Sequence, residues 1–294
     1  MLEFSIIITT YNRKDLLKRA ISSVLNQDYP GFELIIVDDN SNNENRLKTD
    51  EIKSDCVRYH QHEINYGVSA ARNTGIKLAY HPYIVFLDDD DVFHENYLSK
   101  MAEHLKKYPD IDFAWCSKRN KVFENGYCIE EKDYFFSANS FTDTDVCPML
   151  TYWANNLGVM IKKDVFDRIG MFDTKMSSGE DLDLLLRMLN AGMQFVSIPN
   201  VLIDVYIYKS KKSLSRQTTS QKESENLSRM IKKNEIFLIK NRQIWAYYTK
   251  SLIFAYYRAK NKKNARKQLF ELMRHKPTKW PIIFRACKYE LFIN

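Results

Sequence analysis

The stretch from Phe4 to Asp39 reads FSIIITTYNRKDLLKRAISSVLNQDYPGFELIIVDD, and it determines the fold class. It starts with a β-branched apolar run, Phe4 to Thr9, and continues with apolar residues at helical spacing from Leu16 to Leu25. A second apolar run, Phe32 to Val37, follows. A strand, a helix and a strand of these lengths form a βαβ unit with parallel strands. The sequence therefore predicts an α/β protein.

The alternation of strands and helices continues beyond this unit. Further strands are expected at Val57–His60, Tyr83–Leu87 and Phe113–Cys116, with helices at Val68–Ala79 and Asn96–Lys107. The later pattern predicts a hairpin turn at Asn125-Gly126, a strand at Leu157–Ile161, a helix at Leu182–Asn190 ended by Gly192, and a strand at Phe195–Ile198. We expect a largely parallel, Rossmann-like sheet with helices on both faces.

Polar residues gather where three of these strands end. Thr9 to Asn12 follow the first strand, Asp38 to Ser41 follow the second, and Asp88 to Asp91 follow Tyr83–Leu87. Ligands of open α/β sheets bind at the carboxyl ends of the strands. The three groups are therefore expected to meet in one site.

Four consecutive aspartates, Asp88 to Asp91, repel one another at neutral pH unless a cation offsets their charge. A hard divalent cation, Mg²⁺ or Mn²⁺, binds through one or two carboxylates together with substrate phosphates. The run therefore predicts a metal and a phosphorylated ligand. The alternative is a solvated acidic loop.

Asp38 and Asp39 also suit a ligand, although aspartates at a strand-to-helix turn often only cap the helix. Together with Thr9 and Tyr11 they offer a carboxylate acceptor and an aromatic face, which fits a nucleobase. The small-residue helix after Gly67 brings Arg72, whose guanidinium suits a diphosphate. Its alanines and Gly75 equally suit close packing of the helix on the sheet.

The ordered motifs resemble those of the family 2 glycosyltransferases, which have the glycosyltransferase-A fold. The resemblance covers roughly residues 4 to 200 and rests on the motifs Ser5–Asn12, Ser22-x-Val24-Leu25-x-Gln27, Glu33–Ser41, Asn65-x-Gly67, Ala71-Arg72-Asn73-x-Gly75, Phe86-Leu87-Asp88-x-Asp90-Asp91, and Gly179-Glu180-Asp181 with Arg187. Each motif is weak by itself, but their order is specific.

The resemblance implies a transferase that takes a sugar from a nucleotide-diphosphate donor, most directly a UDP-sugar, and inverts the anomeric centre. It implies that the metal is held by Asp90, with Asp88 as a second ligand, and that Asp181 is the catalytic base. The nucleotide-sugar would lie on Thr9, Tyr11, Asn12, Arg13, Asp38, Asp39, Arg72, Asp88 and Asp89. The acceptor would be a saccharide or a lipid-linked saccharide, in the synthesis of a cell-surface polysaccharide.

The chemistry needs such groups, because a base must take the acceptor proton while a cation stabilises the leaving diphosphate. Glu180 competes with Asp181 as the base or contacts the acceptor, and Ser178 could instead form a capping box with Asp181. Relatives often close over the diphosphate with a histidine or arginine. Here the matching segment, Tyr206–Ser213, offers only Lys209, Lys211 and Lys212.

The net charge of +7 is unevenly divided along the chain. Residues 209–294 contain 22 Lys and Arg against 5 Asp and Glu, which is +17; subtracting from 44 and 37 leaves 22 against 32, or −10, for residues 1–208. We therefore expect a catalytic domain at 1–208 and a basic, aromatic-rich helical region at 209–294, with a polar linker at Ser213–Ser228.

This basic region has three interpretations. Lysines and arginines beside Trp and Tyr suit an anionic membrane surface, which the sequence favours. Alternatively the aromatic stripe packs on the catalytic domain or a second subunit, or the region binds nucleic acid. For the protein as a whole, the alternatives to sugar transfer are nucleic-acid binding through the basic region and nucleotide-sugar hydrolysis.

No apolar run approaches the roughly 18 residues that span a bilayer, and the N-terminus lacks a signal-peptide pattern. Five scattered cysteines fit reduced thiols. We expect a cytoplasmic protein, with a peripheral position on the cytoplasmic face of the membrane as the alternative. His60, His62, His81 and His94 are expected to be surface residues.

Overall fold

The structure is a computed structural model that describes residues 1–48, 51, 54–135, 158–209 and 219–274. Its strands are β1 (Phe4–Thr10), β2 (Phe32–Asp38), β3 (Val57–Gln61), β4 (Tyr83–Asp88), β5 (Val92–Phe93), β6 (Phe113–Glu124), β7 (Tyr127–Tyr134), β8 (Val159–Lys162) and β9 (Phe195–Tyr208). Its helices are α1 (Lys14–Leu25), α2 (Val68–Leu78), α3 (Tyr97–Lys107), α5 (Lys163–Ile169), α6 (Glu180–Asn190), α8 (Ser220–Lys233), α9 (Glu235–Lys240), α10 (Arg242–Arg258) and α11 (Lys262–Arg274).

The strands form one sheet in the order β3-β2-β1-β4-β8-β6-β9-β5, with β7 paired to β6. The half made of β3, β2, β1 and β4 is parallel, as the βαβ pattern predicts. In this half Thr10 lies opposite Asp38, and Thr9 lies opposite both Val37 and Asp88. The register therefore brings the three polar strand ends to one edge.

The other half of the sheet is mixed, which corrects the expectation of a largely parallel sheet. β8 runs antiparallel to both β4 and β6, whereas β9 runs parallel to β6. The predicted strand at Phe195–Ile198 extends to Tyr208, because its continuation pairs with residues Ser117 to Phe123 of β6. The Asn125-Gly126 hairpin is confirmed, and both residues have positive φ (52° and 86°), as a type I′ turn requires.

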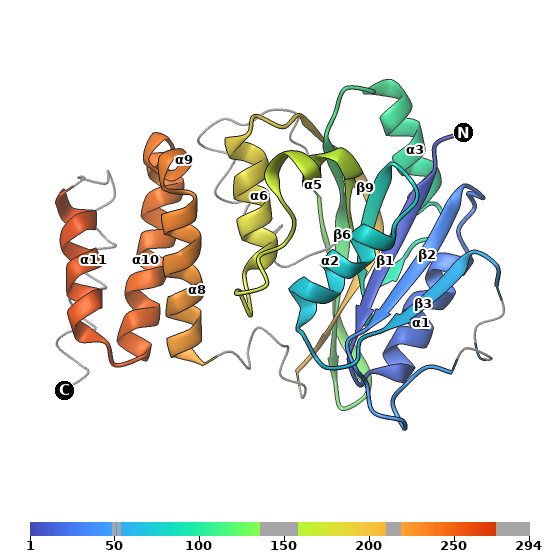
Figure 1. The fold of residues 1–294 in the computed structure, drawn as a ribbon, viewed down its shortest axis with the longest axis horizontal. Coiled ribbons are helices and arrows are strands. Elements are labelled where there is room, and N and C mark those ends of the chain that lie inside the picture. The colour runs from blue at the N-terminus through green and yellow to red at the C-terminus, as the bar shows by residue number, and fades with distance from the viewer. Residues whose placement is uncertain (49–50, 52–53, 136–157, 210–218, 275–294) are drawn as a thin grey trace.

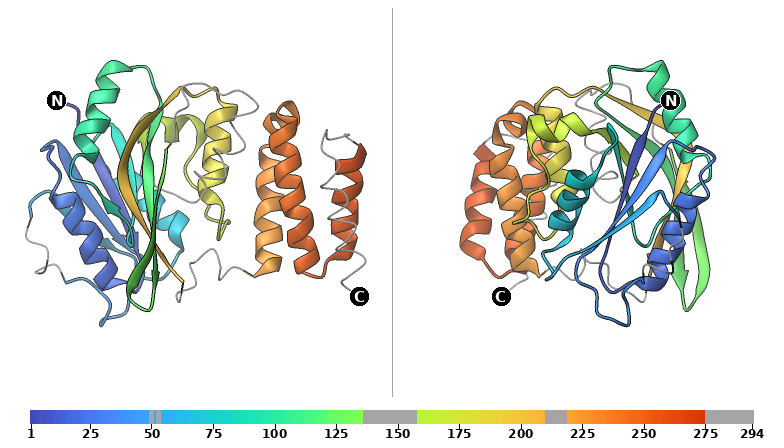
Figure 2. Two further views of the ribbon diagram at one scale, coloured as in Figure 1. Left: turned by 180° about the vertical axis from the view of Figure 1, so that it is seen from behind. Right: turned by 45° about the vertical axis from the view of Figure 1, so that its right-hand side comes forward.

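Helices cover both faces of the sheet, as predicted (Figures 1 and 2). Side chains of β1 alternate between the faces: Ile6 and Ile8 pack with α1 and α3, whereas Ile7 packs with α2, α5 and α6. α6 ends in a Schellman motif, in which Met193 N–H donates to Met188 O (3.1 Å) and Gly192, at φ 70°, donates to Leu189 O (3.1 Å).

The C-terminal helices form a further layer beyond α6 (Figure 1). Met230, Leu238, Ile244 and Tyr248 belong to the same apolar core as α2, α5 and α6. A separate small core between α10 and α11 contains Ile253, Ala265 and Leu272, among others. The expected linker is therefore wrong from residue 220 onward, because Ser220–Lys233 is helix α8.

Several predictions fall on residues outside the described ranges. They are Leu157 of the predicted strand Leu157–Ile161, the part of the predicted helical region beyond residue 274, and the candidate lysines Lys211 and Lys212. Among the described residues, no helix combines the length and the apolar character needed to cross a membrane.

Candidate active site

The four aspartates after β4 have different environments. Asp88 is the most exposed, with 37% of its side chain accessible, whereas Asp89 is almost enclosed at 6%. Asp89 accepts hydrogen bonds from Thr10 Oγ1 (2.7 Å) and Arg13 Nη1 (2.9 Å). Asp89 and Arg13 therefore hold the loop in place on the first strand.

Asp88, Asp90 and Asp91 form the cluster suited to a cation. One carboxylate oxygen from each lies within 4.8 Å of the other two. Burial and the charge of Asp88 raise the pKa of Asp90, and burial together with Asp88 and Asp90 raises the pKa of Asp91 well above its usual range. Three hard oxygen ligands under mutual repulsion fit Mg²⁺ or Mn²⁺. The sequence prediction gave the metal to Asp90 and Asp88, and the structure places Asp91 beside them.

Arg72 lies between this cluster and α6. Its Nη2 donates to Asp88 Oδ1 (3.1 Å), and its Nη1 donates to Glu180 Oε1 (2.7 Å) and Asp181 Oδ1 (3.0 Å). The Arg72 side chain is only 5% exposed. Arg72 was expected to contact the nucleotide; in this structure its guanidinium joins three carboxylates from two segments of the chain, the end of β4 and the start of α6.

Asp181 and Glu180 start α6, and the sequence dictates this placement. Gly179 adopts φ 76° and ends the preceding loop, so that both carboxylates lie in the first turn of the helix. No side chain caps this helix, and Ser178 Oγ instead accepts a hydrogen bond from Asn226 Nδ2 (3.0 Å). The capping-box alternative for Ser178 is therefore wrong.

The electrostatic setting of Asp181 suits a general base. Burial raises its pKa to about 8, assisted by the charges of Glu180 and Asp88, while Arg72 acts in the opposite direction. A carboxylate with a near-neutral pKa accepts a proton far better than an ordinary exposed aspartate. Its side chain is 16% exposed, whereas that of Glu180 is 9% exposed and lies against Arg72.

The expected nucleobase residues lie on the neighbouring strand ends. Tyr11 is 47% exposed at the end of β1. Asp39 is buried and accepts hydrogen bonds from Tyr66 N–H (2.9 Å) and Gly67 N–H (2.7 Å). Asp39 thus fixes the start of α2 and retains acceptor capacity for a ligand.

Asp38 and Asn12 are occupied by the loops themselves. Asp38 is completely buried and accepts hydrogen bonds from Ser41 N–H (2.6 Å) and Tyr59 Oη (2.5 Å). Asn12, at φ 57°, donates its N–H to Ser41 Oγ (2.8 Å) and accepts from Asn42 N–H (2.9 Å). Thr9 lies in β1, three residues before Asn12, and is partly exposed.

Two residues at the site had no recognised sequence signal. His62 was expected at the surface but is buried: its Nδ1 lies 2.7 Å from Asp39 Oδ1 and its Nε2 lies 2.9 Å from Thr74 Oγ1. Arg19 donates to the carbonyl oxygen of Asp90 (2.5 Å) and stacks on Tyr206, 3.7 Å from the ring centre. Of the three candidate lysines, Lys209 pairs with Glu124 (3.4 Å).

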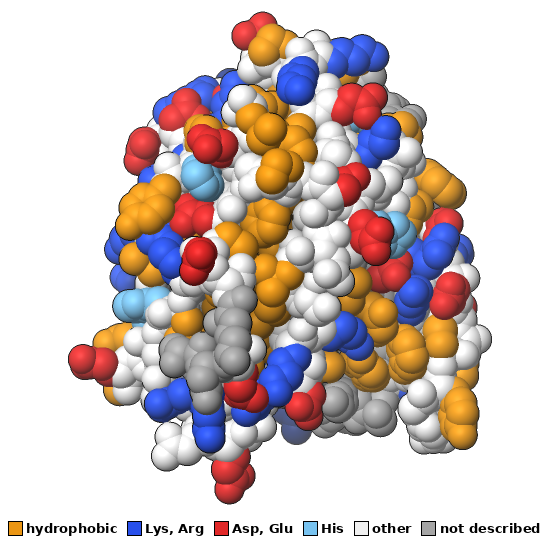
Figure 3. Space-filling view, turned by 90° about the vertical axis from the view of Figure 1, so that its right-hand side faces the viewer, with side chains coloured by type: hydrophobic (Ala, Val, Ile, Leu, Met, Phe, Trp, Pro, Cys, Tyr) orange, Lys and Arg blue, Asp and Glu red, His pale blue; other side chains and the backbone are white. Residues whose placement is uncertain are grey.

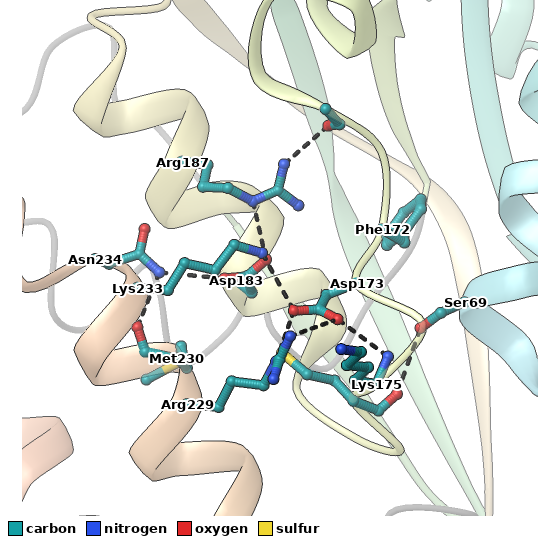
Figure 4. A network of polar contacts seen from close by, with 12 residues as sticks. Ser69, Phe172, Asp173, Lys175, Asp183, Arg187, Arg229, Met230, Lys233 and Asn234 are labelled. Carbon is teal, nitrogen blue, oxygen red and sulfur yellow. Dashed lines mark hydrogen bonds and ion pairs between the residues drawn. The ribbon is translucent and has the colours of Figure 1, made fainter.

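The C-terminal helices support the loop before α6 through charged contacts (Figure 4). Arg229 of α8 donates to Asp173 (2.8 Å), and Lys233 contacts both Asp173 (3.4 Å) and Asp183 (2.9 Å). Asp183 is fully buried and also accepts from Arg187 (2.9 Å). Asn226 completes the contact through Ser177 (3.2 Å) and Ser178.

Comparisons with known proteins bear on the family and the fold of the chain. The family model described as "Glycosyl transferase family 2" matches residues 5–157, and that described as "Glycosyl transferase family group 2" matches residues 83–256. A putative colanic acid biosynthesis glycosyl transferase, WcaA of Escherichia coli, is 32% identical over 190 residues, which are 63% of this chain and 65% of WcaA. The chain spans less than two thirds of the length of the first curated relatives it matches.

Two solved structures show the same fold. Residues 1–349 of S. aureus TarS in complex with UDP-GlcNAc give a TM-score of 0.65 at 18% identity, covering 97% of this chain and 79% of TarS. The mannosyltransferase PcManGT from Pyrobaculum calidifontis, in complex with GDP-Man and Mn²⁺, gives 0.61 at 17% identity, covering 99% and 81%. None of these comparisons supports a nucleic-acid-binding protein or a hydrolase.

Proposed function

The chain belongs to glycosyl transferase family 2, and we propose that it transfers a sugar from a nucleotide-diphosphate donor to a saccharide or lipid-linked saccharide with inversion of configuration. The observation that carries the proposal is the meeting of the cation-suited cluster, Asp88, Asp90 and Asp91, with the carboxylate of Asp181 on either side of Arg72. A base and a site for a diphosphate-bound cation are the two requirements of this displacement.

In the proposed reaction, Asp181 Oδ accepts the proton of the acceptor hydroxyl. The hydroxyl oxygen then bonds to the anomeric carbon as the bond from that carbon to the diphosphate oxygen breaks, and the nucleoside diphosphate leaves. Mn²⁺ or Mg²⁺ held by Asp90 and Asp88, with Asp91 beside them, would supply positive charge to the diphosphate. Arg72 donates hydrogen bonds to both Asp181 and Asp88 and so fixes the position of the base relative to the metal-binding loop.

The donor would occupy the carboxyl edge of the parallel half of the sheet. Tyr11 supplies an exposed ring for stacking, Thr9 and Asp39 supply polar contacts for the base, and Asp88 lies open to ribose or sugar. Asp38, Asn12, Arg13 and Asp89 support this surface from within through the contacts described above. A UDP-sugar is the first choice, since the fold matches that of TarS with UDP-GlcNAc.

The acceptor and location are proposed on separate grounds. Similarity to WcaA supports a role in cell-surface polysaccharide synthesis. Cys56, Cys116 and Cys128 are free thiols, which fits the reducing cytoplasm.

Thermal-shift measurements against UDP-, GDP- and dTDP-sugars test this proposal. One donor class is expected to raise the melting temperature in the presence of Mn²⁺, because a ligand of the native state stabilises it. Asp90→Ala should abolish the Mn²⁺-dependent part of the shift, whereas Glu103→Ala on the exposed side of α3 should keep it. If the donor-induced thermal shift were the same with and without Mn²⁺ and in Asp90→Ala, the metal assignment would be overturned.

A further inference from the structure

The outer face of α11 differs in character from its inner face. Ala265, Leu269 and Leu272 turn inward and pack on α10. The exposed residues Lys263, Lys267, Phe270 and Arg274 follow one another at intervals of four, three and four, which places them on a single stripe of the helix. α11 thus has a second, outward face that combines positive charge with an aromatic ring.

This stripe is apolar as well as basic. Phe270 is 61% exposed and the adjacent Met273 is 41% exposed. The only acidic residue of α11, Glu271, is partly buried and lies about 100° around the helix from Phe270. Glu271 lies four residues after Lys267 and three before Arg274, so it offsets part of their charge, but one carboxylate against Lys263, Lys267 and Arg274 leaves the stripe with a net positive charge.

The position of α11 makes the stripe accessible to a large flat surface. Of the helices that the structure describes, α11 lies farthest from the sheet (Figures 1 and 2). The face at the opposite end of the molecule shows acidic and basic side chains interspersed among hydrophobic ones (Figure 3).

The start of α11 also lies on the same side as the proposed site. β1 starts at the end of the molecule marked N, and the connection from α10 to α11 lies at the other end, where β9 finishes and α8 begins (Figure 1). The carboxyl edge of the parallel strands and the start of α11 thus share one side of the protein.

We propose that the outward stripe of α11, Lys263, Lys267, Phe270, Met273 and Arg274, docks on the surface of an anionic lipid bilayer. Cationic side chains are attracted to anionic headgroups, and Phe and Met insert shallowly into the interface. The inference rests on the proposed function only in that a lipid-linked acceptor would be met at this surface. Vesicle binding itself requires neither donor nor turnover. The membrane proposal and the proposed transferase function can therefore fail separately.

The test is co-sedimentation of the full chain with vesicles of phosphatidylcholine containing about one third phosphatidylglycerol, against vesicles of phosphatidylcholine alone. We expect binding to the anionic vesicles that weakens as salt is raised. The double variant Lys263→Glu/Lys267→Glu should bind at least tenfold more weakly, because each cation near an anionic surface contributes a factor of about five.

Two further variants make the test specific. Phe270→Ser should weaken binding several-fold while keeping its salt dependence, and its exposed position should leave the melting temperature unchanged. Lys106→Glu/Lys107→Glu makes the same charge change on the exposed side of α3 and should bind like the unmodified chain.

Equal binding by the α11 variants, or an equal loss in the α3 control, would overturn the proposal. Binding to RNA without binding to vesicles would assign the stripe to nucleic acid instead. A dimer in light scattering that Phe270→Ser dissociates, again without vesicle binding, would assign it to a second copy of the chain.

Discussion

Arg72 is the residue on which the site's electrostatics depend most. It is nearly enclosed and faces three carboxylates, Asp88, Glu180 and Asp181, which would repel one another without it. Its sequence context, a helix of small residues, gave only the prediction of a phosphate contact. The bridge to α6 joins residues 109 positions apart, and nothing in either local pattern specifies that distance.

Arg72 sets the pH at which the proposed base ionises. The pKa of Asp181 is raised to about 8, so transfer should increase from pH 6 to pH 8 as the carboxylate forms. Arg72 lowers that pKa; Arg72→Gln should therefore move the acidic limb to higher pH and reduce kcat at pH 7 by about 100-fold. The pH dependence of kcat, measured for the unmodified enzyme and for Arg72→Gln, tests this shift. The profile of Arg72→Lys should lie between those two. An unmoved limb in Arg72→Gln would show that Asp181 is not the titrating group.

His62 is expected to act through Asp39. Its ring holds one oxygen of a carboxylate that we assign to the nucleobase. His62→Leu removes this contact and should raise the donor KM about tenfold with little change in kcat, because a hydrogen bond to a charged group contributes about 1.5–3 kcal/mol. His62→Asn keeps a donor near the position of Nδ1 and should restore most of the affinity. A fall in kcat with unchanged KM would contradict this role.

At the scale of elements, α8 holds the loop that leads into the base helix. Arg229 and Lys233 reach Asp173 from α8 (Figure 4). Asn226 of the same helix contacts Ser177 and Ser178 just before α6. Burial of Asp173 opposes its ionised form, but the hydrogen bonds from Arg229 and Lys175 N–H and the charge of Lys233 outweigh it and lower the pKa to about 2.

The contribution of this contact should depend on pH in a defined direction. Because the folded pKa of Asp173 lies below the ordinary 3.8, its stabilisation is present above about pH 4 and is lost as pH falls toward 2. Arg229→Ala should lower the free energy of unfolding at pH 7 by about 1 kcal/mol, and the difference should shrink between pH 4 and pH 2. Arg258→Ala, which breaks the exposed pair with Glu223, is the control and should change little. Equal effects of the two variants would show that the α8 contact is an ordinary surface pair.

The elements that the sequence predicted well are those with strong apolar periodicity. β1, β2, β4, α1, α2 and α3 were all expected within a few residues of their observed bounds. The extension of β6 was missed because Ser117 to Lys121 is polar. The predicted β9 was too short because the sequence does not show that its second half pairs with this part of β6. Their pairing depends on strands that meet only in the folded sheet. The burial of His62 and the grouping of Asp91 with Asp88 and Asp90 were not predicted for the same reason, since burial and convergence are tertiary properties.

Over the whole molecule, the division of charge has a structural use. The acidic part, −10, and the basic part, +17, meet where α8 contacts Asp173 and Asp183. Apolar residues of α8, α9 and α10 also complete the core beside α6. The boundary at residue 208 stays a prediction about function, and we do not expect it to separate two independently stable units.

Truncation tests this expectation. A chain ending at Tyr208 would expose the α6 side of the core that Met230, Leu238 and Ile244 cover. Exposure of that much apolar surface should make the fragment insoluble or lower its melting temperature by more than about 10 °C. A shift of this size is expected when several core side chains lose their packing. A soluble fragment that melts like the full chain would show that residues 209–294 contribute nothing to catalytic-domain stability.

The central claim is that Asp181 removes the acceptor proton beside a metal-dependent donor site. The most direct measurement is the rate of sugar transfer by Asp181→Asn with Mn²⁺ and the best donor, alongside the donor-induced thermal shift of the same variant. We predict that transfer falls by about 1,000-fold while the thermal shift is retained. Transfer within tenfold of the unmodified enzyme would contradict the account.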